Sequence, residues 1–175
     1  TTFKVLLPLR SISEGEYDDW QRSNTVEVKP SSQYSGHILL VEDDNVNAMI
    51  AKKALCNNGH KVTHVTDGQK AIDQFSAHPQ RFDVILMDHH MPIMDGMQAT
   101  IKLHEIYDPA SLPPIIALTA NAMDGEREKY LKVGMQDYCT KPFKKEQLNA
   151  LVQYWLMHQQ STKKQVDSRN LKELS

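Results

Sequence analysis

Short apolar runs alternate along this chain with segments whose apolar residues recur at helical spacing. The runs have the length and composition of buried strands, and they lie at 37–41, 61–65, 84–87, 115–118 and 137–139. The helical patterns lie at 45–57, around 71–75, and at 96–107, 125–133 and 144–157. This alternation predicts an α/β domain with a five-stranded parallel sheet, doubly wound, with helices on both faces.

The alternating body spans residues 36–158, and the segments outside it differ in composition. Residues 10–35 are polar and irregular, which is typical of a linker. Residues 159–175 are polar and slightly basic, so we expect a frayed helical extension or a disordered tail. Residues 1–9 alternate like a strand, yet they have no partner strand near them in the sequence.

Composition narrows the class of protein without identifying it. Of the 175 residues, 40% are hydrophobic and 24% are charged, as in soluble globular proteins. A net charge of −2 gives no reason to expect a nucleic-acid partner. No apolar stretch approaches about 18 residues, so we expect no direct membrane contact and a cytoplasmic location. Cys56 and Cys139 lack metal-type spacing and are expected to be reduced thiols.

Chemically active side chains stand at the ends of four predicted strands. Glu42 and Asp43 follow the first strand, Asp88 the third, Thr119 the fourth and Lys141 the fifth. In an open parallel sheet, ligands bind beyond the carboxyl ends of the strands. We therefore expect the acids, the hydroxyl and the ammonium to converge in one crevice.

Three carboxylates in one crevice repel one another unless a cation lies among them. At about 4 Å and an effective dielectric of about 20, each pair costs about 4 kcal/mol. All-oxygen ligation suits Mg²⁺, with Mn²⁺ as an alternative, and Lys141 adds positive charge from the opposite side. A divalent ion and a lysine around one carboxylate make a site for a phosphoryl group. Asp88 would then be the nucleophile that forms an acyl phosphate, and Thr119 would donate a hydrogen bond to a phosphoryl oxygen.

Four segments resemble the receiver domain of bacterial response regulators, which has a flavodoxin-like fold. They match it in order and spacing, and they are Leu40-Val41-Glu42-Asp43, the stretch from Val84 to Gly96, Ala117-Leu118-Thr119-Ala120 and Lys141-Pro142-Phe143. The resemblance covers about residues 36–158 and implies that Asp88 is the phosphoacceptor of a two-component phosphorelay. The domain would then catalyse phosphoryl transfer to its own aspartate.

The same resemblance implies a ligand set for the metal. Asp43 and Asp88 would bind it directly, and the backbone carbonyl of His90 would complete the protein ligands. Glu42 would act through metal-bound water.

The resemblance also implies a switch, and it contains one departure. Thr119 and Tyr138 would respond to phosphorylation, and the Lys141–Pro142 bond would be cis. His89-His90 stands where hybrid receivers usually carry an aliphatic and a glutamine-like residue. Because His90 borders the attacking water, the lifetime of the acyl phosphate does not follow from the resemblance.

The stretch Val41-Glu42-Asp43-Asp44-Asn45-Val46-Asn47 looks most like receivers fused to hybrid sensor histidine kinases. Residues 1–9 resemble the last strand of a kinase ATP-binding domain, so the chain would begin inside the kinase. The resemblance implies a membrane-bound sensor as the parent protein. It also implies two partners, the histidine kinase domain of the same protein and a histidine phosphotransfer protein. Asp88 would take the phosphoryl group from the first and exchange it with the second.

The first helix predicts where such a partner docks. The stripe predicted to face the sheet is Asn47, Ile50, Ala51, Ala54 and Leu55. The residues predicted to lie outside that stripe are Val46, Ala48, Met49 and Lys53. Together with Pro142 and Phe143, the apolar Val46 and Met49 form the predicted partner-binding face.

Two other functions stay open at this point. A magnesium-dependent phosphohydrolase of the haloacid-dehalogenase type usually has a second aspartate two residues after its nucleophile, where this chain has His90. An interaction module with vestigial phosphorylation would not need the acid pair, Thr119 and Lys141 that this chain retains.

Polar residues beside the site also have simpler interpretations. Asp44 is expected to be an exposed helix-capping acid rather than a further metal ligand, and Asn45 is itself a plausible N-cap. His89 and His90 are expected to be a partly exposed pair and not a metal site, because adjacent side chains point apart in an extended loop.

Overall fold

The computed structural model describes residues 34–120 and 126–173, except the side chains of 126 and 160–173. The strands of this part are β1 (His37–Val41), β2 (Lys61–Val65), β3 (Val84–Asp88), β4 (Ile115–Thr119) and β5 (Asp137–Thr140). They form one sheet in the order β2-β1-β3-β4-β5, and every neighbouring pair is parallel. The predicted five-stranded parallel sheet is confirmed.

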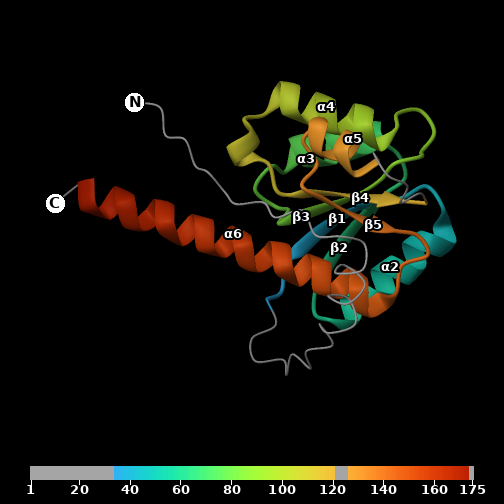
Figure 1. Ribbon diagram of the computed structural model, residues 1–175, viewed down its shortest axis with the longest axis horizontal. Helices are drawn as coiled ribbons and strands as arrows, with labels where there is room; N and C mark the ends of the chain where they lie inside the picture. Colours follow the sequence, from blue (N-terminus) through green and yellow to red (C-terminus); the bar gives the residue numbers. More distant parts are fainter. Residues whose placement is uncertain (1–33, 121–125, 174–175) are drawn as a thin grey trace. The chain divides into compact units, whose positions relative to one another are not determined.

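Helices cover both faces of this sheet, as predicted. The helices of the described part are α2 (Asn45–Asn57), α3 (Gly68–Ala77), α4 (Gly96–Ile106), α5 (Glu126–Lys132) and α6 (Lys145–Glu173), with a short 3₁₀ turn at Pro109–Ser111. Figure 1 shows α3, α4 and α5 on one face and α2 and α6 on the other. A doubly wound sheet of this kind opens a crevice beyond the carboxyl ends of its strands.

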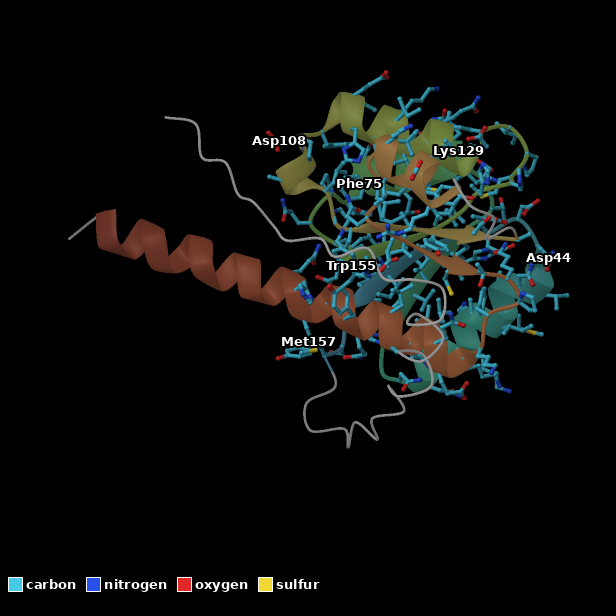
Figure 2. All side chains as sticks on the ribbon, in the orientation of Figure 1. Asp44, Phe75, Asp108, Lys129, Trp155 and Met157 are labelled. Atoms are coloured by element: carbon cyan, nitrogen blue, oxygen red, sulfur yellow. The ribbon has the colours of Figure 1, made fainter. Side chains whose placement is uncertain are left out.

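Two apolar cores, one on each face, hold the layers together. Phe75 of α3 is buried in the first core, and Trp155 of α6 packs against the second, on the opposite face (Figure 2). β3 and β4 are buried along their whole length. Central strands of a parallel sheet are buried on both faces, which is why they read in the sequence as continuous apolar runs.

Aspartates fix the start of three helices. Asp44, Asp67 and Asp95 each precede a helix and accept a hydrogen bond from the backbone N–H three residues later. The prediction that Asp44 caps the first helix is confirmed, and Asn45 as the N-cap is wrong. Asn45 is already helical, because the extended residue before it is Asp44.

The stripe predicted to face the sheet in the first helix is also partly wrong. Ala48 is 5% exposed and faces the core, whereas Ile50 is 37% exposed and lies at its edge. The buried residues of α2 are Ala48, Ala51, Ala54 and Leu55. The small alanine Ala48 therefore joins the stripe that faces the core, and Ile50 lies at its edge. Helix α6 continues past Met157 to Glu173, which agrees with the helical extension that was one of the two expectations for residues 159–175, and no Gly or Pro interrupts the sequence there.

The assignments of residues 1–9 and of most of the linker at 10–35 lie outside the described residues. None of the described helices is both long and apolar enough to cross a bilayer.

Candidate functional site

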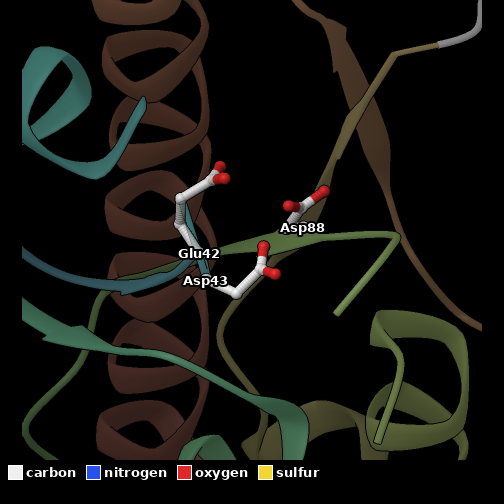
Figure 3. A group of neighbouring side chains, drawn as sticks. All are labelled: Glu42, Asp43 and Asp88. Atoms are coloured by element: carbon white, nitrogen blue, oxygen red, sulfur yellow. The ribbon is translucent and has the colours of Figure 1, made fainter. Parts of the chain in front are cut away.

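The strand order brings three predicted acids to one place. β1 and β3 are neighbours, so Glu42 and Asp43, which follow β1, stand beside Asp88 at the end of β3. Their carboxylate oxygens lie within 4.8 Å of one another. Figure 3 shows the carboxylates of Asp43 and Asp88 facing each other, with that of Glu42 beside them. The predicted convergence of the acids is confirmed.

Lys141 directly follows β5, an edge strand two places from β3, and its side chain reaches this cluster. Its Nζ lies 2.7 Å from Asp88 Oδ2 and 2.5 Å from Glu42 Oε2. Its backbone N–H donates to the Thr119 carbonyl, 2.6 Å away. The cis bond to Pro142 follows directly, as predicted. The acids Glu42, Asp43 and Asp88 carry three negative charges and Lys141 carries one positive charge. The net charge of −2 is one that a divalent cation would neutralise.

Burial divides the acids. Glu42 is 1% exposed and Asp88 is 6% exposed, whereas Asp43 lies open to solvent. Burial raises the pKa of Glu42, and the charge of Asp88 adds to that rise, while Lys141 opposes it. Burial alone would lower the pKa of Lys141, but its hydrogen bonds to Asp88 and Glu42 outweigh burial and raise it. The ammonium therefore stays protonated at neutral pH and is held between two acids.

The loop after Asp88 is tightly constrained. The Gly96 N–H donates to the His89 carbonyl at 3.1 Å, and a Cβ at Gly96 would lie 2.1 Å from the Asp88 carbonyl oxygen. Only glycine fits there. Ile93 adopts φ 70°, which is unusual for a β-branched residue. His90 is exposed, and its backbone N–H lies 3.4 Å from Asp88 Oδ1.

Thr119 lies at the end of β4 and is 1% exposed. Its Oγ1 accepts a hydrogen bond of 2.9 Å from the hydroxyl of Tyr130, a residue of α5. The same hydroxyl lies 3.1 Å from Nδ1 of His89. The sequence analysis missed Tyr130, because a tyrosine within a short helical pattern gives no sign that its hydroxyl reaches a strand end.

The other predicted residues lie around this centre. Tyr138 is half-buried on β5, paired in register with Ala117, and its ring lies 6.4 Å from that of Tyr130. His89 and His90 form the partly exposed pair that was predicted, but their side chains do not point apart. Their rings stack with centroids 4.1 Å apart, because the chain turns sharply at this loop instead of extending.

The predicted partner-binding face is apolar and accessible in part. Val46 is 59% exposed and Met49 is 64% exposed, both on α2. Pro142 is exposed and Phe143 is half-buried against the second core. Isolated apolar residues at a surface are common, so their position near the acids is what makes them candidates.

A parallel five-stranded sheet with paired acids, a third acid and a lysine at its carboxyl edge defines a receiver-type domain. The chain matches the response regulator receiver domain family over residues 38–153 and belongs to that family. It is thus a domain of two-component signalling.

Solved structures agree with this membership. The receiver domain of a sensor histidine kinase from Pseudomonas aeruginosa is 44% identical, with a TM-score of 0.61, and the match covers 70% of this chain and 98% of that one. That structure has a magnesium ion coordinated in its active site cleft.

Curated relatives are much longer proteins. Hybrid signal transduction histidine kinase I of Dictyostelium discoideum is 37% identical over 69% of this chain and 7% of its own length. Sensor protein GacS of Pseudomonas syringae is 38% identical over 72% of this chain and 14% of its own length. Transcription factor SKN7 of Candida albicans is 40% identical over 73% and 22%. The chain therefore spans less than a quarter of each.

Proposed function

We propose that Asp88 accepts a phosphoryl group from a phosphohistidine of a histidine kinase. The observation that carries this proposal is a buried carboxylate held 2.7 Å from a lysine, with two further acids beside it. A carboxylate oxygen of Asp88 attacks phosphorus, the N–P bond breaks, and the imidazole keeps the bonding electrons. Lys141 is placed to neutralise charge on the phosphoryl oxygens, and the Thr119 hydroxyl to donate to one of them.

The donor set fits a hard divalent cation. Carboxylate oxygens from Asp43 and Asp88 and the backbone carbonyl of His90 would hold Mg²⁺ or Mn²⁺, with Glu42 acting through a bound water. When bound, the ion supplies positive charge that draws the phosphoryl oxygens to the acids. The residual charge of the four side chains, and magnesium in the cleft of the related Pseudomonas receiver, support this assignment.

The response to phosphorylation would be a shift between two arrangements. Thr119 would move toward the phosphoryl group and Tyr138 would turn inward. Phosphorylation only biases an equilibrium that already exists. The half-buried position of Tyr138 beside the Thr119 strand supports this role.

Acetyl phosphate with magnesium tests the phosphoacceptor. Intact-mass spectrometry should show a gain of about 80 Da, expected for one phosphoryl adduct. Asp88→Asn should abolish that gain, and Asp73→Asn, which changes an exposed acid on α3, should preserve it. Excess chelator should also prevent labelling. Equal labelling of the Asp88→Asn protein would refute the assignment.

The family membership disfavours the phosphohydrolase and the phosphorylation-independent module. Turnover of a small phosphate ester would support the first, and failure to react with acetyl phosphate would support the second.

A histidine phosphotransfer protein is the proposed partner for onward transfer. It must bring an imidazole to Asp88, so it would dock across the rim formed by Val46, Met49, Pro142 and Phe143, as an amphipathic helix with a small apolar centre. The similarity to a much longer hybrid signal transduction histidine kinase supports such a relay.

Charged substitutions test this face. Replacing Val46 and Met49 with Asp should leave acetyl-phosphate labelling intact and slow transfer to the partner at least tenfold, about 1.4 kcal/mol. Replacing Ile101 and Ile106 with Asp, at exposed positions of α4 on the opposite face of the sheet, should not slow transfer. An unchanged rate in the first double variant would place docking elsewhere.

The organisation of the parent protein is a further part of this proposal. Residues 1–9 would end a kinase ATP-binding domain, and residues 10–35 would link it to the receiver at 36–158, with 159–175 as its C-terminal extension. The kinase domain of the same chain would then be the first phosphoryl donor. The domain would act on the cytoplasmic side of a membrane-bound sensor, where the kinase is supplied with ATP.

A further inference from the structure

The buried hydroxyl of Tyr130 connects α5 to the strand end that carries Thr119. Tyr130 is 1% exposed, its Oη donates to Thr119 Oγ1 at 2.9 Å, and His89 Nδ1 lies 3.1 Å from the same oxygen. We propose that Tyr130 is a positioning residue that restrains Thr119 in the unphosphorylated arrangement and so opposes activation. This inference rests on the proposed role of Thr119 in binding the phosphoryl group.

The tyrosine ring is fixed from two sides. The His89 ring meets it edge-on, with centroids 5.3 Å apart and an interplanar angle of 84°. The Tyr138 ring lies on another side at 6.4 Å. A side chain packed in this way loses its neighbours if it moves, so the hydroxyl cannot follow Thr119 freely.

Movement of Thr119 toward the phosphoryl group therefore breaks its hydrogen bond with the Tyr130 hydroxyl. The unphosphorylated arrangement thereby loses a buried hydrogen bond, and the hydroxyl keeps its contact with His89 Nδ1. The phosphoryl oxygen offers Thr119 a charge-assisted bond, which is the stronger of the two. The exchange favours the phosphorylated arrangement, but by less than it would if Tyr130 carried no hydroxyl.

Contact with His89 places this restraint next to the phosphoacceptor. His89 directly follows Asp88, and its backbone N–H donates to the Leu118 carbonyl at 2.9 Å, one residue before Thr119. One hydroxyl thus contacts side chains from the ends of both β3 and β4. A change at either strand end disturbs the same hydrogen-bonded group.

The substitution Tyr130→Phe removes the hydroxyl and keeps the ring. Beryllofluoride with magnesium, which mimics the phosphoryl group, is titrated into both proteins and followed by amide spectra. The variant should bind it about threefold to tenfold more tightly, the range that one hydrogen bond accounts for. The Thr119 methyl resonance without beryllofluoride should also move toward its bound position.

Tyr107→Phe is the matched control. It removes a hydroxyl that donates to Ser76 at 2.9 Å, at an exposed place after α4. Its beryllofluoride affinity and Thr119 methyl shift should equal those of the wild type. If beryllofluoride leaves the amide spectra of the wild-type protein unchanged, that result would contradict the proposed function itself. A wild type that responds, with a Tyr130→Phe variant of equal or weaker affinity, would overturn only the restraint.

Discussion

The two ends of the sheet both carry polar side chains, yet they use them in opposite ways. At the carboxyl end, Glu42, Asp43 and Asp88 crowd together around the single ammonium of Lys141. At the amino end, the polar side chains make hydrogen bonds mainly to the backbone. The first arrangement leaves net charge, and the second leaves almost none.

The amino end satisfies the segments that enter the strands. Asp83 Oδ2 accepts from the His37 N–H at 2.8 Å, and the Asp83 N–H donates back to the His37 carbonyl at 2.8 Å. Gln153 of α6 accepts from the Tyr34 N–H at 3.1 Å and donates to the Tyr34 carbonyl at 2.9 Å. Asp83 and Gln153 thus complete backbone groups that would otherwise be unpaired.

This difference separates structural from functional polarity. A side chain that pairs with backbone stabilises the fold and has no capacity left for a ligand. Carboxylates that repel one another weaken the fold, and they retain capacity for a cation and a phosphoryl group. The left-handed Ile93 in the loop beside Asp88 is a second unfavourable feature at the same end.

The largest effect should come from removing the cation that lies among the three acids, Lys141. Lys141→Met leaves Glu42 and Asp88 buried without a counter-charge, which should cost about 3 kcal/mol of unfolding free energy at neutral pH in chelator. Urea denaturation measures it. Because burial already raises the pKa of Glu42, mild acid should protonate that carboxyl and recover part of the loss.

An ion pair whose lysine is exposed supplies the control for this change. Lys70 lies 2.8 Å from Asp67, but its side chain is 58% exposed. Lys70→Met should cost less than Lys141→Met, because the Lys70 ammonium is largely hydrated and the buried Asp67 keeps the hydrogen bond that it accepts from the Lys70 N–H. Equal losses in the two variants would mean that the crowded acids around Lys141 are not special.

Two aspartate-to-asparagine changes should have opposite signs. Asp43→Asn removes one of three crowded charges and should stabilise the protein by about 1 kcal/mol in chelator, the scale of two charges at 4 Å in water. Asp83→Asn weakens the acceptor for the His37 N–H and should destabilise by about 1 kcal/mol. Thermal unfolding in chelator measures both. A loss of stability in both proteins would contradict the proposed contrast between the ends.

The sequence predicted the carboxyl end far better than the amino end. Acids and a lysine directly after apolar runs can be placed by the rule that parallel strands end at one edge. Glu42, Asp88 and Lys141 followed from that rule alone. At the amino end, Gln153 lies over 90 positions from His60 in the sequence, and no sequence pattern indicates that their side chains are in contact.

The reach of the Tyr130 side chain and the rotation of α2 about its axis could not be predicted from the sequence, for a different reason. The Tyr130 hydroxyl meets Thr119 only because α5 packs against β5, the strand next to β4, in a way that brings this hydroxyl to the strand end. The exposure of Ile50 and burial of Ala48 depend on a small rotation of α2 about its axis, which an apolar pattern of mixed alanines does not determine.

The smallest effect should be a pH dependence at the amino end, centred on His60. This residue is 4% exposed, and burial lowers its pKa below the ordinary 6.5. Its Nδ1 accepts from the Gly36 N–H at 3.3 Å, and its other ring nitrogen lies 3.2 Å from the Gln153 amide nitrogen.

Burial disfavours the charged imidazolium, and Nδ1 already accepts from the Gly36 N–H, so protonation is disfavoured in the folded state. As pH falls below 6.5 the unfolded chain takes up a proton that the folded chain does not, and stability is lost down through the folded pKa. His60→Asn should therefore flatten the fall in unfolding free energy between neutral pH and pH about 5. His37, whose pKa burial also lowers, should keep part of the slope in that variant. Urea denaturation across this range measures the slope, and an unaltered slope would show that His60 does not titrate differently in the folded and unfolded states.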